Sequence, residues 1–243
     1  MKQILRVTLC LITSLFILSG CGKSLSEAEL PRPSSRTAMA TQSFPGIVMI
    51  TGQKLCTGTF VSPSTILTAA HCLLDAGPFT VHTTRGPIQT TQKVTLGSGA
   101  EGDPFDVALL YLPSPVASPQ EIIPVASGAS VGDAVTLVGF GCSSSEIPAS
   151  GGIKRLGSNI IAERSEFLEV ATPGIQIKQI AGPENRAGAC FGDSGGPLLK
   201  KVGELFMVIG VSHGAYNEGS RQMSQFVDFS QPSVRNFLST YIR

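Results

Sequence analysis

The chain has 243 residues and a formal net charge of +1, and charged residues make up only 14% of it. Because 42% of the residues are hydrophobic, the chain is not fully disordered, and its length allows one or two domains with a sizeable core. A nucleic-acid partner is not expected, because proteins that bind nucleic acids carry basic patches.

Residues 1–20 have the pattern of a secretory signal peptide. A positively charged start precedes an apolar run over 7–18 that is too short to span a bilayer comfortably. Residues 18–21, with the sequence LSGC, resemble the lipobox of bacterial lipoproteins. The resemblance implies that Cys21 carries a lipid and becomes the first residue of a protein attached to the bacterial cell envelope. Gly22 in place of an Asp favours the outer membrane, and release from the cell is a further outcome. A retained membrane anchor or a buried helix is the alternative interpretation of the apolar run.

The next segment, residues 21–43, is rich in Ser, Ala, Pro and Thr and has no apolar period. This composition predicts a flexible tether or pro-segment between the lipid and the folded part. The alternative is that part of the segment packs as an N-terminal strand or arm.

From Phe44 onward, short apolar runs of strand length alternate with turn residues, which predicts an all-β fold. The predicted strands cover residues 46–50, 57–61, 65–70, 79–84, 107–112, 131–140, 159–162, 167–171, 205–212 and 225–229. The C-terminus differs, because Ser233 after Pro232 can cap a helix. The apolar side chains on one face of that helix are Val234, Phe237, Leu238 and Tyr241.

The chain has six cysteines, of which Cys10 falls in the predicted signal and Cys21 in the lipobox. The remaining four can pair in three ways, and an exported protein can form disulfides. These four are Cys56, Cys72, Cys142 and Cys190. No CxxC occurs and the Cys/His spacings do not match a zinc site, so neither a metal nor a cofactor is expected.

Three segments carry residues suited to acyl-transfer chemistry. The sequence TAAHC at 68–72 ends a predicted strand with His71, and imidazole is the usual general base near neutral pH. Asp106 abuts the apolar run 107–112, where a carboxylate needs a partner and can orient a histidine. Asp103 is the weaker candidate. Each of these residues alone also fits a structural role.

The third segment has the sequence GDSGGP at 192–197. Its glycines allow a tight turn that exposes the hydroxyl of Ser194 and directs backbone N–H groups to one point. An ordinary loop is the alternative for this segment alone. A phosphate-binding loop is disfavoured, because the GxxxxGK[ST] pattern is absent.

Together the three segments resemble the chymotrypsin/trypsin-like serine peptidases, in which His, Asp and Ser follow one another in this order. The resemblance covers about residues 44–243. It implies two six-stranded antiparallel β-barrels, at 44–118 and 119–231, and a short C-terminal helix at 232–243. It also implies a catalytic triad of His71, Asp106 and Ser194, with an oxyanion hole formed by the N–H groups of Gly192 and Ser194.

The same resemblance implies the cysteine pairing. Cys56 and Cys72 match the family's disulfide beside the catalytic histidine. Cys190 matches a family cysteine near the nucleophile whose usual downstream partner is missing here. Because Cys142 follows a Gly-aromatic-Gly turn near the same site, a Cys142–Cys190 bridge is expected. Two free thiols are the alternative.

The specificity pocket departs from that of trypsin. The position six residues before Ser194 is Gly188, so no aspartate is there to bind Lys or Arg. Gly214 and Ser224 are expected to form the remaining walls, which predicts a neutral pocket. His213 replaces an aromatic residue of the family and is expected to be a partly exposed neutral side chain.

Activation is the other departure. The family pairs the Asp before the nucleophile, here Asp193, with a newly cut N-terminal amine, but no Ile-Val-Gly-Gly segment precedes Phe44. Either a different N-terminal amine pairs with Asp193, or its carboxylate is satisfied by another group. The sequence therefore predicts an exported serine endopeptidase that cleaves protein or peptide substrates without basic specificity. A catalytically silent homologue that binds a partner protein is the alternative.

Overall fold

The computed structural model describes residues 39–143, 150–173 and 186–243. The predicted signal peptide, Cys21 and most of the predicted tether lie outside these residues. Within the part of the chain that is described, no helix is long and apolar enough to cross a bilayer.

The first sheet has seven antiparallel strands in the order β6-β5-β2-β3-β4-β8-β7. In chain order they are β2 (Ile47–Thr51), β3 (Leu55–Phe60), β4 (Thr65–Thr68), β5 (Phe79–Thr83), β6 (Gly86–Thr90), β7 (Lys93–Thr95) and β8 (Ala108–Tyr111). The two end strands, β6 and β7, follow each other closely in the chain. Residues 86–95 therefore pair with β5 at one end and with β8 at the other, so that the sheet curves round a common core.

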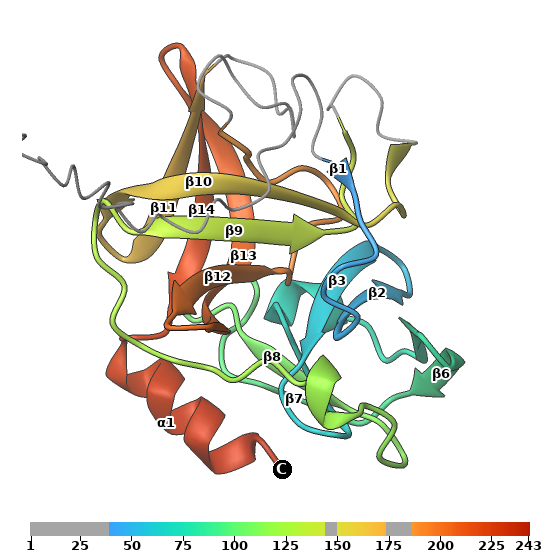
Figure 1. The fold of residues 1–243 in the computed structure, drawn as a ribbon. Helices are drawn as coiled ribbons and strands as arrows, with labels where there is room; N and C mark the ends of the chain where they lie inside the picture. Colours follow the sequence, from blue (N-terminus) through green and yellow to red (C-terminus); the bar gives the residue numbers. More distant parts are fainter. Residues whose placement is uncertain (1–38, 144–149, 174–185) are drawn as a thin grey trace, which may run out of the picture. The chain divides into compact units, whose positions relative to one another are not determined.

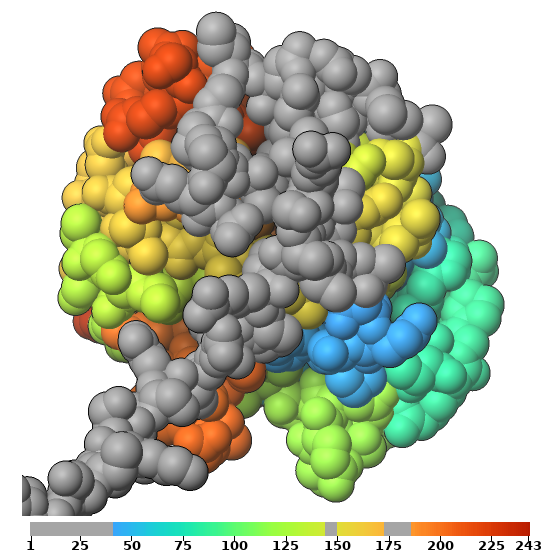
Figure 2. All heavy atoms as spheres, turned by 45° about the horizontal axis from the view of Figure 1, so that its top comes forward, coloured from blue at the N-terminus to red at the C-terminus, as the bar shows by residue number. Residues whose placement is uncertain are grey.

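The second sheet has the order β1-β10-β11-β14-β13-β12-β9, and an additional β9–β10 pairing closes six of its strands into a barrel. The strands are β1 (Met39–Ala40), β9 (Ala134–Gly139), β10 (Arg155–Arg164), β11 (Phe167–Pro173), β12 (Pro197–Val202), β13 (Leu205–Glu218) and β14 (Arg221–Asp228). In Figure 1 this sheet lies above the first, and in Figure 2 the orange and red residues of β13 and β14 lie opposite the teal residues around β5 and β6.

The predicted all-β architecture is confirmed, with several local differences. The strand β1 lies inside the predicted tether and pairs with β10 through Met39 and Leu156. The alternative that part of this segment packs as an N-terminal strand is thus the one observed. The strands β6, β7 and β12 were not predicted, and β10 begins four residues before its predicted start at Asn159. The inward positions of the early part of β10 are Arg155, Gly157 and Asn159, so polar and glycine residues hide the apolar alternation that marks a half-buried strand.

The C-terminal helix α1 covers Pro232–Tyr241, and its N-cap is Gln231 rather than the predicted Ser233. Proline suits the first helical turn because its missing N–H would have had no helical partner there. Val234, Phe237 and Leu238 are buried as predicted, whereas Tyr241 is 37% exposed.

Apolar side chains form two buried clusters. One joins the first sheet to α1 and to the adjacent side of the second sheet, and the other lies on strands of the closed barrel. The first cluster thus packs the two sheets against each other, so that loops from both sheets can meet at the junction. The residues singled out from the sequence lie at this junction.

Candidate active site

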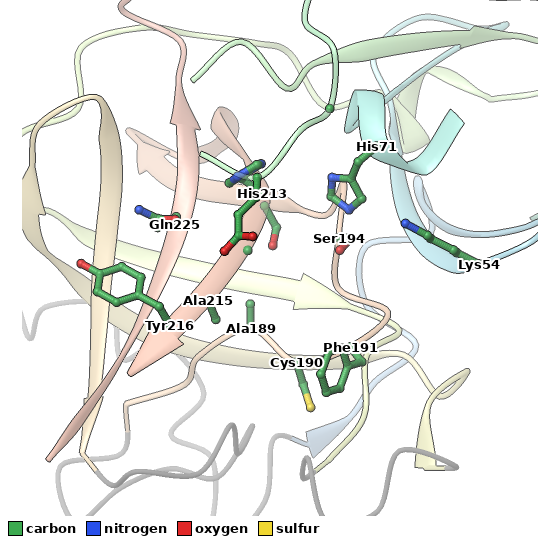
Figure 3. A pocket seen from close by; sticks show the side chains of 14 residues that line it. Lys54, His71, Ala189, Cys190, Phe191, Ser194, His213, Ala215, Tyr216 and Gln225 are labelled. Atoms are coloured by element: carbon green, nitrogen blue, oxygen red, sulfur yellow. The ribbon is translucent and has the colours of Figure 1, made fainter. Parts of the chain in front are cut away.

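Each of the three candidate catalytic residues stands next to a strand end. His71 lies in the short helix η1 (Ala70–Leu73) that follows β4, and Asp106 lies just before β8. These two strands pair with each other, which brings both residues to one edge of the first sheet. Ser194 lies in the loop before β12 of the second sheet. The site is therefore assembled from both sheets, and Figure 3 shows Ser194 beside His71.

His71 is bound to Asp106 through two contacts. The ring Nδ1 of His71 lies 2.6 Å from Oδ2 of Asp106, and the backbone N–H of His71 donates to Oδ1 at 2.8 Å. An ionised carboxylate can only accept hydrogen bonds, so the proton of a neutral His71 ring sits on Nδ1. The other ring nitrogen, Nε2, is left as a base.

A second histidine binds the same carboxylate, which the sequence did not lead us to expect. The ring Nδ1 of His213, in β13, lies 2.6 Å from Oδ2 of Asp106, and its Nε2 accepts the N–H of Gly102 at 3.2 Å. The tautomer is thereby assigned, with the proton on Nδ1. The ring stacks on Phe167 with centroids 5.1 Å apart. His213 is half-buried as a whole, as expected, but only 7% of its side chain is exposed.

Asp106 is fully buried. Burial alone would raise its pKa, but hydrogen bonds from His213 and His71 outweigh this effect and lower the pKa to about 2. The carboxylate is therefore ionised at neutral pH. A buried negative charge next to an imidazole favours the imidazolium form that appears when the base takes up a proton.

Asp103 instead organises its own loop, as expected for the weaker candidate. Its side chain accepts hydrogen bonds from the N–H groups of Ser98, Gly99 and Phe105 and from the Ser98 hydroxyl. Burial opposes the shift, but these bonds lower the pKa of Asp103.

The loop that carries Ser194 leaves two backbone donors open. Gly192 has φ +101°, a value that favours glycine. Among the hydrogen bonds of the described residues, neither the N–H of Gly192 nor that of Ser194 donates to any acceptor. The N–H groups of Asp193, Gly195 and Gly196 are used, since Asp193 donates to the carbonyl of Cys190 at 2.9 Å, Gly195 to that of Ser212 at 2.9 Å and Gly196 to that of Asp193 at 2.8 Å. The two open donors are the ones that the sequence assigned to an oxyanion hole.

The first sheet supports this loop directly. The N–H of Thr57 in β3 donates to the carbonyl of Ser194 at 2.8 Å, and the Thr57 hydroxyl donates to the carbonyl of Gly192 at 2.8 Å. Gly195 fits here because an added Cβ would lie only 2.0 Å from the hydroxyl oxygen of Thr68. The position of Ser194 is thus determined by contacts across the two sheets.

The carboxylate of Asp193 is buried and bound by backbone donors of its own sheet. It accepts the N–H of Gly141 at 2.8 Å and the N–H of Cys190 at 2.9 Å. Glycine is needed on the facing turn, because an added Cβ at Gly139 or Gly141 would lie 2.1 or 2.3 Å from a carboxylate oxygen of Asp193. In the absence of an Ile-Val-Gly-Gly segment, these backbone donors supply part of the hydrogen bonding that the Asp193 carboxylate needs.

Both expected cysteine pairs are present. Cys56 is bonded to Cys72, and Cys142 is bonded to Cys190 with their Cα atoms 5.4 Å apart. The first bridge joins β3 to η1, which carries His71. The second joins the turn after β9 to the loop that carries Ser194, and so supports the open N–H groups.

A pocket of about 390 Å³ opens beside His71 and Ser194. Small residues form part of its lining, namely Ala189, Gly214 and Ala215, and the only carboxylate among its described lining residues is Glu101. Figure 3 shows Ala189 and Ala215 on the side of Ser194 away from His71. The lining is thus largely uncharged.

Of the three predicted pocket residues, only Gly214 lines this pocket. Gly188 and Ser224 are both buried behind the lining. The hydroxyl of Ser224 accepts the N–H of Ala189 at 2.9 Å, and an added Cβ at Gly188 would lie 2.7 Å from the Thr172 hydroxyl oxygen. Gly188 and Ser224 support the wall rather than form its surface.

Sequence reasoning missed two residues of this region. The contact of His213 with Asp106 has a weak signal, a histidine in place of an aromatic residue in a strand that passes the site. The burial of Arg155 has no signal in the sequence. This residue is 7% exposed and donates to the carbonyls of Gly141, Ser150 and Ile153. An arginine in a predicted loop gives no indication of burial.

Comparison with known proteins agrees with this geometry. The sequence profile of the family named Trypsin matches residues 34–234. A trypsin from Saccharopolyspora erythraea is 29% identical over 166 residues, which are 61% of this chain and 71% of that protein. Serine protease SP24D from Anopheles gambiae is 28% identical over 213 residues, or 79% of this chain and 76% of that one. The structure of human heparin binding protein shares the fold, with a TM-score of 0.63, 17% identity, and coverage of 85% of this chain and 95% of its own. The chain belongs to the trypsin family.

Proposed function

We propose that this protein is a serine endopeptidase that cleaves peptide bonds through an acyl-enzyme. The observation that carries the proposal is the pairing of His71 with buried, ionised Asp106, beside a Ser194 hydroxyl and two open backbone N–H groups. A base that is oriented by a carboxylate next to an exposed hydroxyl is the arrangement that activates a serine nucleophile.

The mechanism follows from the positions of these groups. Ser194 attacks the carbonyl carbon of the substrate, and Nε2 of His71 takes up the hydroxyl proton. The negative charge that develops on the carbonyl oxygen is stabilised by the N–H groups of Gly192 and Ser194, and the loss of one such donor typically costs about 10²–10³ in rate. His71 then gives the proton to the leaving amine, and water hydrolyses the acyl-enzyme by the same steps in reverse order.

Asp106 acts by holding the imidazole and stabilising its charged form, and it keeps its own negative charge throughout. No hydrogen bond joins the Ser194 hydroxyl to His71 in the described part of the chain. Hydrogen bonds of this kind are commonly long or poorly aligned before a substrate binds and form fully only in the complex, so the absence of this bond is compatible with the role.

The pocket beside Ser194 supports a neutral specificity. Gly188 offers no carboxylate, and the lining contains alanines and Gly214. We expect a small or apolar side chain on the residue before the cleaved bond, and not Lys or Arg. Protein or peptide chains are the proposed substrates.

Export and lipid attachment through Cys21 belong to the same proposal. They rest on the sequence of residues 1–21 and on the two disulfides, which persist in oxidising compartments. The purified native protein tests this part by intact mass, because acylation at Cys21 and removal of residues 1–20 together give a defined mass.

Covalent labelling tests the proposed reaction. A fluorophosphonate probe is incubated with the full chain and with Ser194→Ala, and each is weighed by intact-mass spectrometry. We expect one adduct on the wild type and none on the variant. If the folded wild type takes up no probe, it is either an uncleaved precursor or a silent homologue that binds a partner. Labelling is then repeated after limited proteolysis within residues 22–46: an adduct identifies a precursor, and its continued absence identifies a silent homologue. A positive result leads to a search for cleavage sites in a peptide library.

A further inference from the structure

A buried cation lies close to the loop that carries Ser194, although no sequence motif points to it. Arg155 begins β10, which runs beside β9 in Figure 1. Its guanidinium donates to Gly141 O at 2.8 Å, to Ser150 O at 3.0 Å and to Ile153 O at 3.2 Å. In the described part of the chain, none of its hydrogen bonds goes to a carboxylate. Among the described residues, the positive charge is therefore satisfied by carbonyl dipoles and contacts no carboxylate.

The carbonyl of Gly141 begins a chain of hydrogen bonds. It shares a peptide group with the N–H of Cys142, and that N–H donates to the carbonyl of Phe191 at 2.9 Å. The carbonyl of Phe191 in turn shares a peptide group with the N–H of Gly192. Two peptide groups thus connect the guanidinium of Arg155 to an open donor of the proposed oxyanion hole.

All dipoles in this chain point the same way. A cation on the first carbonyl polarises its peptide group, makes the Cys142 N–H a better donor, and so polarises the next peptide group as well. Cooperative strengthening of this kind is about 10–30% per bond. The same bonds also fix the orientation of the peptide group between Phe191 and Gly192. If that group turned over, the N–H of Gly192 would point away from the substrate.

We infer that Arg155 is a positioning residue of the oxyanion hole, which orients and polarises the N–H of Gly192 through the peptide groups of Gly141–Cys142 and Phe191–Gly192. This inference rests on the proposed function. The chain lacks an Ile-Val-Gly-Gly segment. The buried side chain of Arg155 would therefore do part of the work of ordering the loop that carries Ser194.

The first measurement observes the Gly192 amide directly. Phe-Gly occurs only twice in the sequence, at 140–141 and 191–192. Carbonyl-¹³C phenylalanine together with ¹⁵N glycine therefore gives two signals in a carbonyl-filtered amide spectrum of the full chain. Phe191→Leu removes one signal and so assigns it, and Phe191 is 62% exposed, so this change is tolerated.

The test variant is Arg155→Met, which keeps most of the side-chain length and removes the charge. Arg155→Lys keeps the charge but has one donor group where the guanidinium reaches three carbonyls. Lys154→Met is the matched control, because Lys154 is the adjacent residue and its ammonium donates to the carbonyl of Phe44 at 2.9 Å, outside this chain of hydrogen bonds.

We expect the Gly192 signal to shift or broaden in Arg155→Met, to return part of the way in Arg155→Lys and to stay in place in Lys154→Met. The rate of fluorophosphonate labelling should fall by about tenfold or more in Arg155→Met, less than the 10²–10³ that removal of a whole donor costs. For a small ester substrate the loss should appear in kcat, with KM nearly unchanged, because the interaction forms with the transition state.

A Gly192 signal that does not move in Arg155→Met overturns the inference, and so does an equal movement in Lys154→Met. If Arg155→Met does not fold, the Gly192 signal of Arg155→Lys decides in the same way. A wild type that takes up no probe, before or after limited proteolysis, refutes the proposed peptidase activity alone, because the spectra still show whether Arg155 orients the Gly192 amide.

Discussion

The contact between His213 and Asp106 gives a prediction whose size can be worked out from the structure. The carboxylate of Asp106 accepts three hydrogen bonds, two from His71 at 2.8 and 2.6 Å and one from His213 at 2.6 Å. Replacing His213 with Phe preserves an aromatic ring against Phe167 and removes the third donor. The N–H of Gly102 also loses its acceptor, but Gly102 is exposed and water can replace it.

Removing a hydrogen bond to a buried charged group costs about 1.5–3 kcal/mol. We therefore expect His213→Phe to lower the free energy of unfolding by about 2 kcal/mol at pH 8, a pH at which unfolded histidines are neutral. With a urea m-value of about 1–3 kcal/mol/M, the urea midpoint should fall by about 1 M. The labelling rate of Ser194 should fall as well, because Asp106 is then held only by His71.

His213→Asn separates the hydrogen bond from the ring. Its amide nitrogen can occupy the place of Nδ1 and donate to Asp106, so this variant should retain most of the stability and labelling rate despite losing the ring. The control is His82→Phe, which removes a 2.9 Å contact with Thr51 away from the site and should leave labelling unchanged. If His213→Phe unfolds at the wild-type urea concentration, or if His213→Asn is damaged as much as His213→Phe, the reasoning is refuted.

Two further predictions concern acid stability and the second disulfide. The pKa of Asp106 falls from 3.8 to about 2 on folding, so its charge contributes about 1.8 × 1.36, or about 2 kcal/mol, of stability that is present above pH 4 and lost as the pH falls through 2. The stability difference between wild type and Asp106→Asn in urea should therefore shrink from pH 4.5 to pH 2.5, and a constant difference would contradict the assigned pKa. Replacing Cys142 and Cys190 together with Ala opens a loop with a sequence separation of 48, which should remove about 4 kcal/mol through the entropy of the unfolded chain and slow the labelling of Ser194. Unchanged unfolding and labelling in this double variant would show that the bridge does not support the loop.

Much of the fold could be predicted because local pattern and tertiary environment agree. The runs around β4 and β8 are short and apolar, and both strands are buried where they pair with each other. Their neighbours in the chain, His71 and Asp106, are brought together as a consequence. The strand β6 was missed because its sequence, GPIQT, contains a glycine and a proline, which are typical of turns.

The sequence by itself determined the order of His71, Asp106 and Ser194, the glycine-rich loop, the all-β architecture and the family of the chain. Each of these follows from the types of residue in short segments of the chain, whose spacing and chemistry are visible in the sequence. Only the tertiary structure showed that His213 shares the carboxylate of Asp106 and that Arg155 is buried against the carbonyl of Gly141. Both contacts join segments whose burial and direction depend on how the strands of the second sheet pair, and local composition does not encode that pairing.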